Sequence, residues 1–366
     1  MAGTANEFEP VVVQTCEEHA AGERKHLLRP RHDDPITQFL IQDPFGLRKA
    51  IVPMFMADTE GRLHGMGTAF AADSWGTFLT ADHVIDLVRG GGPQTGPANE
   101  QIFTFGGDHN LIALLGIGLI FGTMGIPQEA LARFVETFSP AIQIDDPLAF
   151  TRGGVDHKAL DIAVLKSATR PPPDMIRNLP IRLGYAGPRV GDVVVAVGYP
   201  QIDTVHGNAE RVATRVEEGM FAGYGRVTAL HPHGRDRSQL TPVFEVAADW
   251  PSGMSGGPVF NMAGEVIGLV SRGLAPEEGE SLGTAWATWF EALPQLPSWA
   301  PTLDPLNPGH RRVWGARRFA PWSLAGVAPT QAEAAALAAA AGPEFEVVHG
   351  SWPIGTDDLI SSGADQ

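Results

Sequence analysis

A glycine-rich turn at residues 251–260, PSGMSGGPVF, restricts the folds and the chemistry open to this chain more than any other segment does. Gly256, Gly257 and Pro258 oppose a helix after Ser255. The apolar residues that follow favour a β-hairpin with its turn at Ala263-Gly264. A serine held in such a turn is a candidate nucleophile. Because a serine hydroxyl is a poor nucleophile by itself, it also needs a histidine base and a carboxylate that orients the imidazole.

Both partners are found upstream of the serine. His83 lies in GTFLTADHVIDLV, where an apolar strand-like stretch ends in small residues. Asp161 lies in HKALDIAVLK, where one acid interrupts an apolar β-type run, and a buried carboxylate there requires a partner. The alternatives to Asp161 are three nearby acids, Asp145, Asp146 and Asp156.

The order of these residues in the chain separates the known classes of serine hydrolase. His83, Asp161 and Ser255 follow the order of the chymotrypsin group, whereas subtilisins have Asp, His, Ser and α/β-hydrolases have Ser, Asp, His. GMSGG also matches the G-x-S-x-G pattern of lipases and esterases. That elbow must continue into a helix, so the hairpin expected after Ser255 excludes it.

Three segments in this order, TADHV, LDIAVL and GMSGGPV, resemble the motifs of the trypsin-like serine peptidases. Within that family the chain is most similar to the bacterial Deg or high-temperature-requirement type, and GEVIGLVSRG resembles the strand after the nucleophile. The resemblance covers roughly residues 45–295. It implies an all-β fold of two antiparallel six-stranded β-barrels with short helices, and a serine endopeptidase that works through an acyl-enzyme without a cofactor or metal.

Further site residues follow from the turn and from the resemblance. The backbone N–H groups of Gly253 and Ser255 are expected to form an oxyanion hole. The resemblance implies that Ser271, Arg272 and Gly273 pair with substrate as an added strand. It places Asp249 at the base of the specificity pocket, where an acid would favour Arg or Lys, and Gly283 and Thr284 at the far wall.

Two points of this pocket stay open. PSGMS is one residue longer than the corresponding turn of many relatives. The alternative to the acidic pocket is therefore that Asp249 points outward and that Ser271, Gly273 and Thr284 shape a shallow pocket for small aliphatic side chains. Trp286 is either part of the far wall or ordinary core packing. Met254 stands where secreted zymogens of the family have an acid, so activation by an N-terminal ion pair is not expected.

Composition bears on which partners the chain binds and in which compartment we expect it. Lys and Arg number 26 against 42 Asp and Glu, a net charge of −16, which argues against nucleic acid as a partner. The single cysteine, Cys16, forms no intrachain disulfide, and the N-terminus lacks a secretory pattern, so we expect a cytoplasmic protein. The apolar stretch 111–126 is shorter than the roughly 20 residues that span a bilayer, so barrel strands are expected there and no membrane contact.

The remaining segments are expected to lie outside the barrels or to connect their strands. Residues 1–44 are predicted to be an arm on the first barrel, and residues 127–138, PQEALARFVETF, a short amphipathic helix. Residues 296–366 are predicted to be a proline-rich connector and a C-terminal extension, in which RRVWGARR at 311–318 is a solvated loop. One helix begins at a Thr330/Glu333 capping box and ends at Gly342, and FEVVHGSWPI adds one strand.

The sequence leaves two alternatives to an active protease with protein or peptide substrates. The first is a catalytically silent relative that only binds peptides or other proteins. The second is a protease switched on by a regulatory protein partner, because the extra termini offer surfaces for docking.

Overall fold

The computed structural model describes part of the chain, and all structural statements below concern that part. The described residues are 12–15, 38–42, 47–57, 63–72, 76–89, 100–105, 110–115, 130–144, 157–169, 171, 187–199, 220–236, 239–262, 266–276, 283–293, 310–328, 330–353 and 356–361.

Six antiparallel strands close the first barrel in the order β10-β5-β4-β3-β7-β8, and β8 pairs back with β10. Their bounds are β3 (Ile51–Ala57), β4 (Leu63–Ala71), β5 (Thr77–Thr80), β7 (Asn110–Leu114), β8 (Leu131–Gln143) and β10 (Ala163–Ser167). β6 (Glu100–Thr104) and β9 (His157–Ala159) pair with β8 outside this ring. The short helix α2 (Leu47–Ala50) precedes β3, and the 3₁₀ turn η1 (Asp82–Ile85) and helix α3 (Asp86–Arg89) follow β5.

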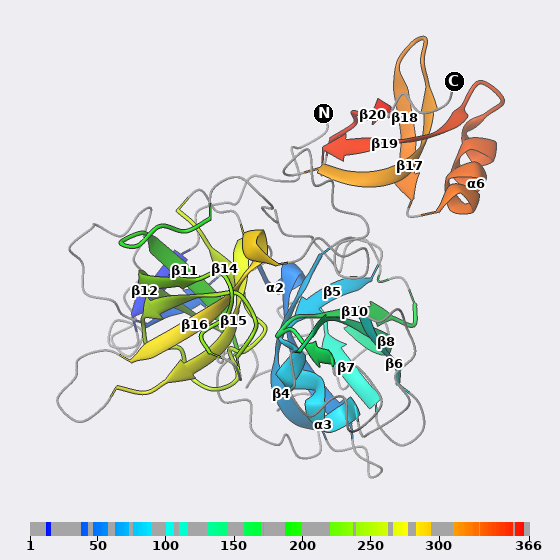
Figure 1. The fold of residues 1–366 in the computed structure, drawn as a ribbon. Helices are drawn as coiled ribbons and strands as arrows, with labels where there is room; N and C mark the ends of the chain where they lie inside the picture. The colour runs from blue at the N-terminus through cyan, green and yellow to red at the C-terminus, as the bar shows by residue number, and fades with distance from the viewer. Residues whose placement is uncertain are drawn as a thin grey trace.

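The second barrel is also a closed ring of six antiparallel strands, in the order β12-β11-β14-β15-β16-β13, with β13 paired back to β12. Its strands are β11 (Val193–Gly198), β12 (Phe221–His231), β13 (Val243–Ala247), β14 (Pro258–Phe260), β15 (Val266–Leu274) and β16 (Thr284–Trp289), and the 3₁₀ turn η4 (Phe290–Ala292) follows. Figure 1 shows the two barrels beside each other. The expected all-β fold of two six-stranded barrels is confirmed.

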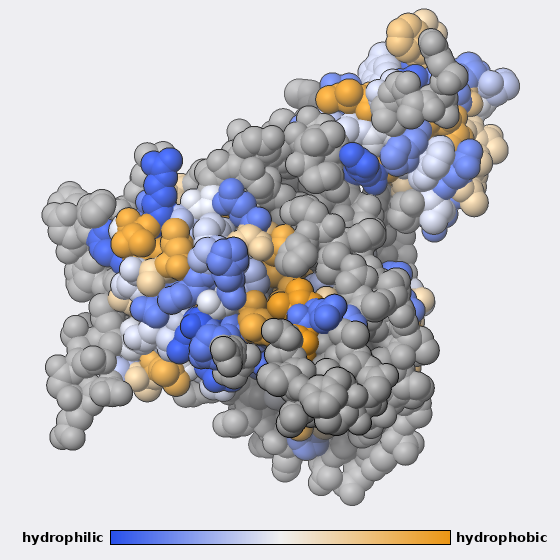
Figure 2. All heavy atoms as spheres, viewed as in Figure 1, coloured by the Kyte–Doolittle hydropathy of each residue, from blue (hydrophilic) through white to orange (hydrophobic). Residues whose placement is uncertain are grey.

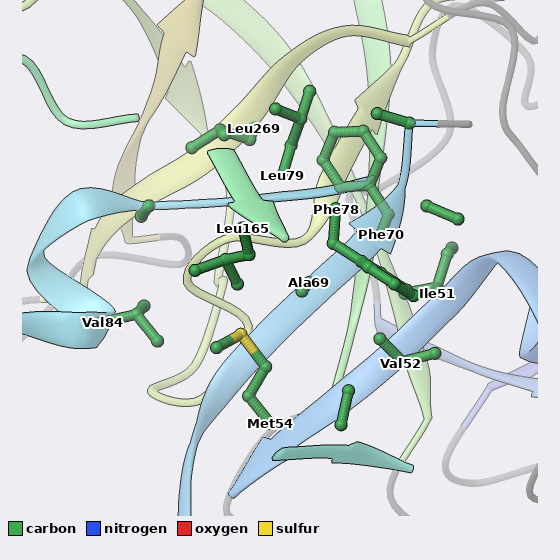
Figure 3. Packing of buried hydrophobic residues seen from close by; sticks show 14 of the residues in the cluster. Ile51, Val52, Met54, Ala69, Phe70, Phe78, Leu79, Val84, Leu165 and Leu269 are labelled. Atoms are coloured by element: carbon green, nitrogen blue, oxygen red, sulfur yellow. The ribbon is translucent and has the colours of Figure 1, made fainter. Parts of the chain in front are cut away.

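One continuous hydrophobic core joins the two barrels. Figure 3 shows Phe70, Phe78 and Leu79 of the first barrel together with Leu269, which comes from β15 of the second. The rings of Phe78 and Phe134 meet edge to face at 5.3 Å. Because each fully buried side chain of this size contributes about 1.5–3 kcal/mol, this shared packing fixes the junction where the catalytic residues are expected.

The N-terminal arm lies elsewhere than predicted. Its described strands are β1 (Val12–Thr15) and β2 (Gln38–Gln42), which pair with each other. β2 also pairs with β12 of the second barrel, at Leu40 opposite Phe221. The prediction that the arm lies on the first barrel is therefore wrong for these strands, because β12 offers a free backbone edge there.

The helix predicted at residues 127–138 is also wrong, because β8 occupies most of that segment. Ala132 and Phe134 are buried, whereas Arg133 and Val135 are exposed, so the side chains alternate with the period of a strand. β8 pairs with β6, β7, β9 and β10. These four pairings outweigh the helix propensity of the Ala and Glu residues.

The C-terminal extension contains a sheet of its own, in the order β18-β17-β19-β20. These strands are β17 (His310–Arg318), β18 (Ser323–Ala328), β19 (Glu346–Pro353) and β20 (Ile360–Ser361). The predicted helix is α6 (Gln331–Ala341), and Thr330 Oγ1 accepts a hydrogen bond from the Glu333 N–H at 3.3 Å. RRVWGARR is β17 rather than a solvated loop: Arg311 is 1% exposed and its neighbour Arg312 is exposed, as strand alternation requires.

The helices and the surface of the described residues can be set against what a bilayer-spanning helix requires. Their helices are all too short or too polar to cross a bilayer. Figure 2 shows apolar residues scattered among hydrophilic ones over the described part of one face.

Candidate active site

The first barrel supplies the histidine and the aspartate. His83 lies in η1, directly after β5, and its side chain is 41% exposed. Asp161 lies at the bend between β9 and β10 rather than inside a strand, and its side chain is 18% exposed. Asp161 Oδ1 is 2.9 Å from His83 Nδ1 and accepts the His83 backbone N–H at 3.2 Å. The predicted pair is therefore brought together, whereas its rivals Asp145, Asp146 and Asp156 lie outside the described residues.

Three hydroxyl groups of the second barrel hold Asp161 in place. The Asp161 N–H donates to Thr241 Oγ1 at 2.8 Å, and Thr288 Oγ1 donates to the Asp161 carbonyl at 2.9 Å. Ser271 Oγ donates to the second carboxylate oxygen, Oδ2. These contacts fix both the backbone and the carboxylate of Asp161 across the junction of the barrels.

Ser271 also connects this carboxylate to the candidate nucleophile. Ser255 lies in the turn before β14, and its hydroxyl donates to the carbonyl oxygen of Ser271 at 3.3 Å. Among the described residues, no hydrogen bond joins Ser255 Oγ to the His83 ring. Ser255, Ser271, Asp161 and His83 thus form one connected cluster, with the serine hydroxyl directed at a backbone carbonyl.

The electrostatics of the pair favour a charged imidazole beside a carboxylate. Burial lowers the pKa of His83, but the hydrogen bond and the charge of Asp161 outweigh it and raise that pKa above the ordinary 6.5. Burial raises the pKa of Asp161, but the hydrogen bonds from His83 and Ser271 and the charge of His83 outweigh it and hold that pKa below 3.8. Arg272 opposes protonation of His83, whereas Asp82 favours it.

Asp82, the residue before His83, holds the turn that carries the histidine. Its carboxylate accepts hydrogen bonds from Arg89 of α3 and from Ser139 of β8. The Asp82 and Arg89 side chains are each 11% exposed. Burial raises the pKa of Asp82, which the hydrogen bonds and the charge of Arg89 oppose.

The glycine turn around Ser255 carries the two backbone N–H groups that the sequence assigns to the oxyanion hole. The Met254 N–H donates to the Pro251 carbonyl at 3.2 Å, and Gly253 has a φ of +95°, which side chains rarely allow. In the described part of the chain, the N–H groups of Gly253 and Ser255 donate no hydrogen bond. Their assignment to an oxyanion hole stays a prediction from the sequence. Met254 is fully buried in the second barrel.

The predicted substrate strand has one open edge. β15 pairs with β14 only as far as Leu269, but with β16 as far as Leu274. Among the described strands, Ser271, Arg272 and Gly273 therefore have no partner on the β14 side, which is the side that an added substrate strand needs.

The residues assigned to the specificity pocket do not all face the same way. Asp249 is exposed, whereas the next residue, Trp250, is buried and donates its indole N–H to the Gly223 carbonyl at 3.2 Å. The Ala248 N–H donates to the carbonyl of Gly283, and Thr284 begins β16 beside them.

Trp286 is buried on the outer side of β16, beneath Arg235. The Arg235 guanidinium carbon is 3.9 Å from the centre of the Trp286 ring. The Trp286 indole N–H donates to Glu245 at 3.2 Å. Trp286 is therefore a packing residue held by two charged neighbours.

Sequence reasoning missed the hydroxyl groups that support the site. Thr241 and Thr288 contact Asp161 across 80 and 127 positions of sequence. The sequence predicts Ser271 as a substrate-pairing residue and as part of the shallow pocket, but not as a support of Asp161. Threonine is ordinary both in a strand such as β16 and in a bend such as the one before β13, so only the folded contacts reveal these roles.

Comparison with known proteins identifies the family of the chain. The family profile described as a trypsin-like peptidase domain matches residues 65–269, more than half of the chain, including His83, Asp161 and Ser255. Among solved structures, the chain is similar to an HtrA-type protease, AlgW with decapeptide, at 19% identity and a TM-score of 0.33. That match covers 66% of this chain and 61% of the other, less than two thirds of its length. No curated protein matches the chain. The chain belongs to the trypsin-like peptidase family.

Proposed function

We propose that the chain is a serine endopeptidase with His83, Asp161 and Ser255 as its catalytic residues. The observation that carries the proposal is the hydrogen-bonded cluster at the barrel junction, in which Asp161 holds His83 and Ser271 links Asp161 to Ser255. Protein or peptide substrates are proposed on the same ground.

The contact between Asp161 and His83 assigns the role of each imidazole nitrogen. Asp161 accepts a hydrogen bond from the Nδ1–H group, so Nδ1 keeps its proton and Nε2 carries the lone pair that acts as the base. Ser255 first turns its hydroxyl from the Ser271 carbonyl to this nitrogen by rotation about its Cα–Cβ bond.

His83 Nε2 then removes the Ser255 proton while Ser255 Oγ attacks the peptide carbonyl carbon. The N–H groups of Gly253 and Ser255 stabilise the negative oxygen that forms. When the carbon–nitrogen bond breaks, His83 gives its proton to the leaving amine. Water, activated by His83, then hydrolyses the acyl-enzyme at Ser255, which restores the hydroxyl and releases the acid.

One observation favours a second candidate, a protease that a partner switches on. Ser255 Oγ contacts the Ser271 carbonyl instead of the His83 ring, as expected for a resting state. A binding partner that rotates this side chain would then activate the enzyme. A permanently silent relative is less well supported, because the His83–Asp161 pair and the amides of Gly253 and Ser255 are the groups that catalysis requires. A location in the cytoplasm stays a prediction from the sequence.

The test is hydrolysis of an unstructured protein, such as casein, by the full chain and by Ser255→Ala. Ser252→Ala, an exposed serine of the same turn, is the matched control. We expect cleavage by the wild type and by Ser252→Ala, and a loss of at least about a thousand-fold in Ser255→Ala. Equal hydrolysis by the wild type and Ser255→Ala would reject the proposal.

A further inference from the structure

Thr68, in β4 of the first barrel, lies against the turn that carries Ser255, although the two are far apart in sequence. Its side chain is fully buried. We propose that the hydroxyl of Thr68 is a positioning group that sets the shape of the oxyanion hole. This inference rests on the function proposed above and adds to it a residue that touches neither substrate nor the reacting atoms.

Every polar group of Thr68 is used. Its N–H donates to the Ser255 carbonyl at 2.9 Å, and its Oγ1 donates to the Gly253 carbonyl at 2.9 Å. The same Oγ1 accepts the Tyr199 N–H at 2.9 Å, and the Thr68 carbonyl accepts Thr80 Oγ1 at 2.7 Å. Because the hydroxyl has one donor and one acceptor partner, its proton has a single direction, toward Gly253.

These bonds hold the peptide groups on both sides of the Ser255 N–H. The Gly253 carbonyl is held by Thr68 Oγ1, the Met254 carbonyl by the Gly257 N–H at 2.9 Å, and the Ser255 carbonyl by the Thr68 N–H. Three consecutive peptide planes are therefore fixed. The Ser255 N–H lies in the middle plane, so these bonds set its direction. The Gly253 N–H lies in the plane just before the first, which is joined to it through the backbone of Gly253 at a φ of +95°.

The close approach of the two segments shows that the contact is built into the fold. A Cβ on Gly256, which has a φ of +84°, would lie 2.2 Å from the Thr68 carbonyl. A Cβ on Gly198 would lie 3.0 Å from Thr68 Oγ1. The turn can therefore reach Thr68 only because glycine occupies both positions.

The arrangement is reciprocal between the barrels. The second barrel holds Asp161 of the first through Thr241, Ser271 and Thr288, whereas the first barrel holds the Ser255 turn of the second through Thr68. Oxyanion stabilisation depends on donors placed before the reaction begins, so a loosened turn costs rate rather than substrate affinity.

The experiment compares Thr68→Val, which loses only the hydroxyl, with Thr68→Ser, which keeps it. Thr137→Val, the same change at a buried threonine of β8, is the control. Hydrogen–deuterium exchange of peptides covering residues 251–260 and the kinetics of a fluorogenic peptide are measured in the full chain. Thermal unfolding confirms that each variant is folded.

We expect Thr68→Val to increase exchange in residues 251–260 at least about tenfold and to lower kcat about ten- to a hundred-fold, with KM within about twofold. Thr68→Ser and Thr137→Val should stay close to the wild type in both measurements. Unchanged exchange in a folded Thr68→Val, or a Thr68→Ser as impaired as Thr68→Val, would overturn the inference. A wild type without Ser255-dependent turnover, but with the turn loosened in Thr68→Val, would overturn the proposed function and leave the positioning role of Thr68 supported.

Discussion

Asp161 Oδ1 contacts both the ring and the main chain of His83, at 2.9 Å from Nδ1 and 3.2 Å from the backbone nitrogen. One carboxylate oxygen therefore fixes the position and the tautomer of the histidine together. Because the neutral ring is the base, activity should increase as the pH rises through the pKa of His83, which lies above 6.5.

The first prediction concerns this pKa. In Ser255→Ala protein, titration of the His83 ring by NMR should give a value above 6.5. Adding Asp161→Asn removes the charge that raises the pKa and leaves the burial that lowers it, so the midpoint should move down. An unchanged midpoint in the Asn variant would show that Asp161 does not act on His83.

The second prediction concerns Ser271, whose hydroxyl donates to the Asp161 carboxylate. Ser271→Ala should lower the free energy of unfolding by about 1.5–3 kcal/mol at neutral pH, because a hydrogen bond to a buried charge is lost. Urea unfolding measures the change, with Ser252→Ala as the exposed control. If Ser271→Ala and Ser252→Ala had the same free energy of unfolding, the hydroxyl of Ser271 would not stabilise Asp161, and the prediction would be wrong.

The third prediction is that His83, Asp161 and Ser255 act as one unit, since they serve the same proton transfer. Adding His83→Ala to Ser255→Ala should reduce the remaining hydrolysis rate by less than about threefold. Single-variant and double-variant rates with one peptide substrate provide the comparison. Losses that multiply would indicate separate roles for the two residues.

The fourth prediction separates the two pockets that the sequence left open. A desolvated Asp249 at the pocket base would direct cleavage after Arg or Lys, and Asp249→Ser would lower kcat/KM for such substrates about ten- to a hundred-fold. Because Asp249 is exposed in the structure, we expect the other profile: cleavage after small aliphatic residues, unchanged by Asp249→Ser. A peptide library cut mainly after Arg or Lys would contradict that expectation.

The fold and the catalytic motifs were predictable because their chemistry restricts nearby residues. A nucleophile turn before β14 requires Gly253 and Gly256 at positive φ, and these glycines stand next to Ser255 in the sequence. The two partners likewise occur at the ends of apolar runs that are strands β5 and β10.

The predictions that were wrong concern segments whose structure depends on pairing with strands that lie far away in the sequence. Residues 131–138 have a helix-forming composition, yet four neighbouring strands hold β8 extended. The RRVWGARR segment is strand β17 because it pairs with β19, which comes from residues far along the chain. The contact of Thr68 with Gly253 spans 185 positions, and no local pattern marks it.

The most direct measurement of the central claim is labelling of the full chain with a fluorophosphonate probe, followed by mass spectrometry of the labelled peptide. An activated serine should react near one-to-one, with the label on Ser255 and on no other serine. Ser252→Ala should label like the wild type, and His83→Ala should label at least about a hundred-fold more slowly because the base is gone. Label on another serine, or labelling of Ser255 that does not depend on His83, would contradict the account.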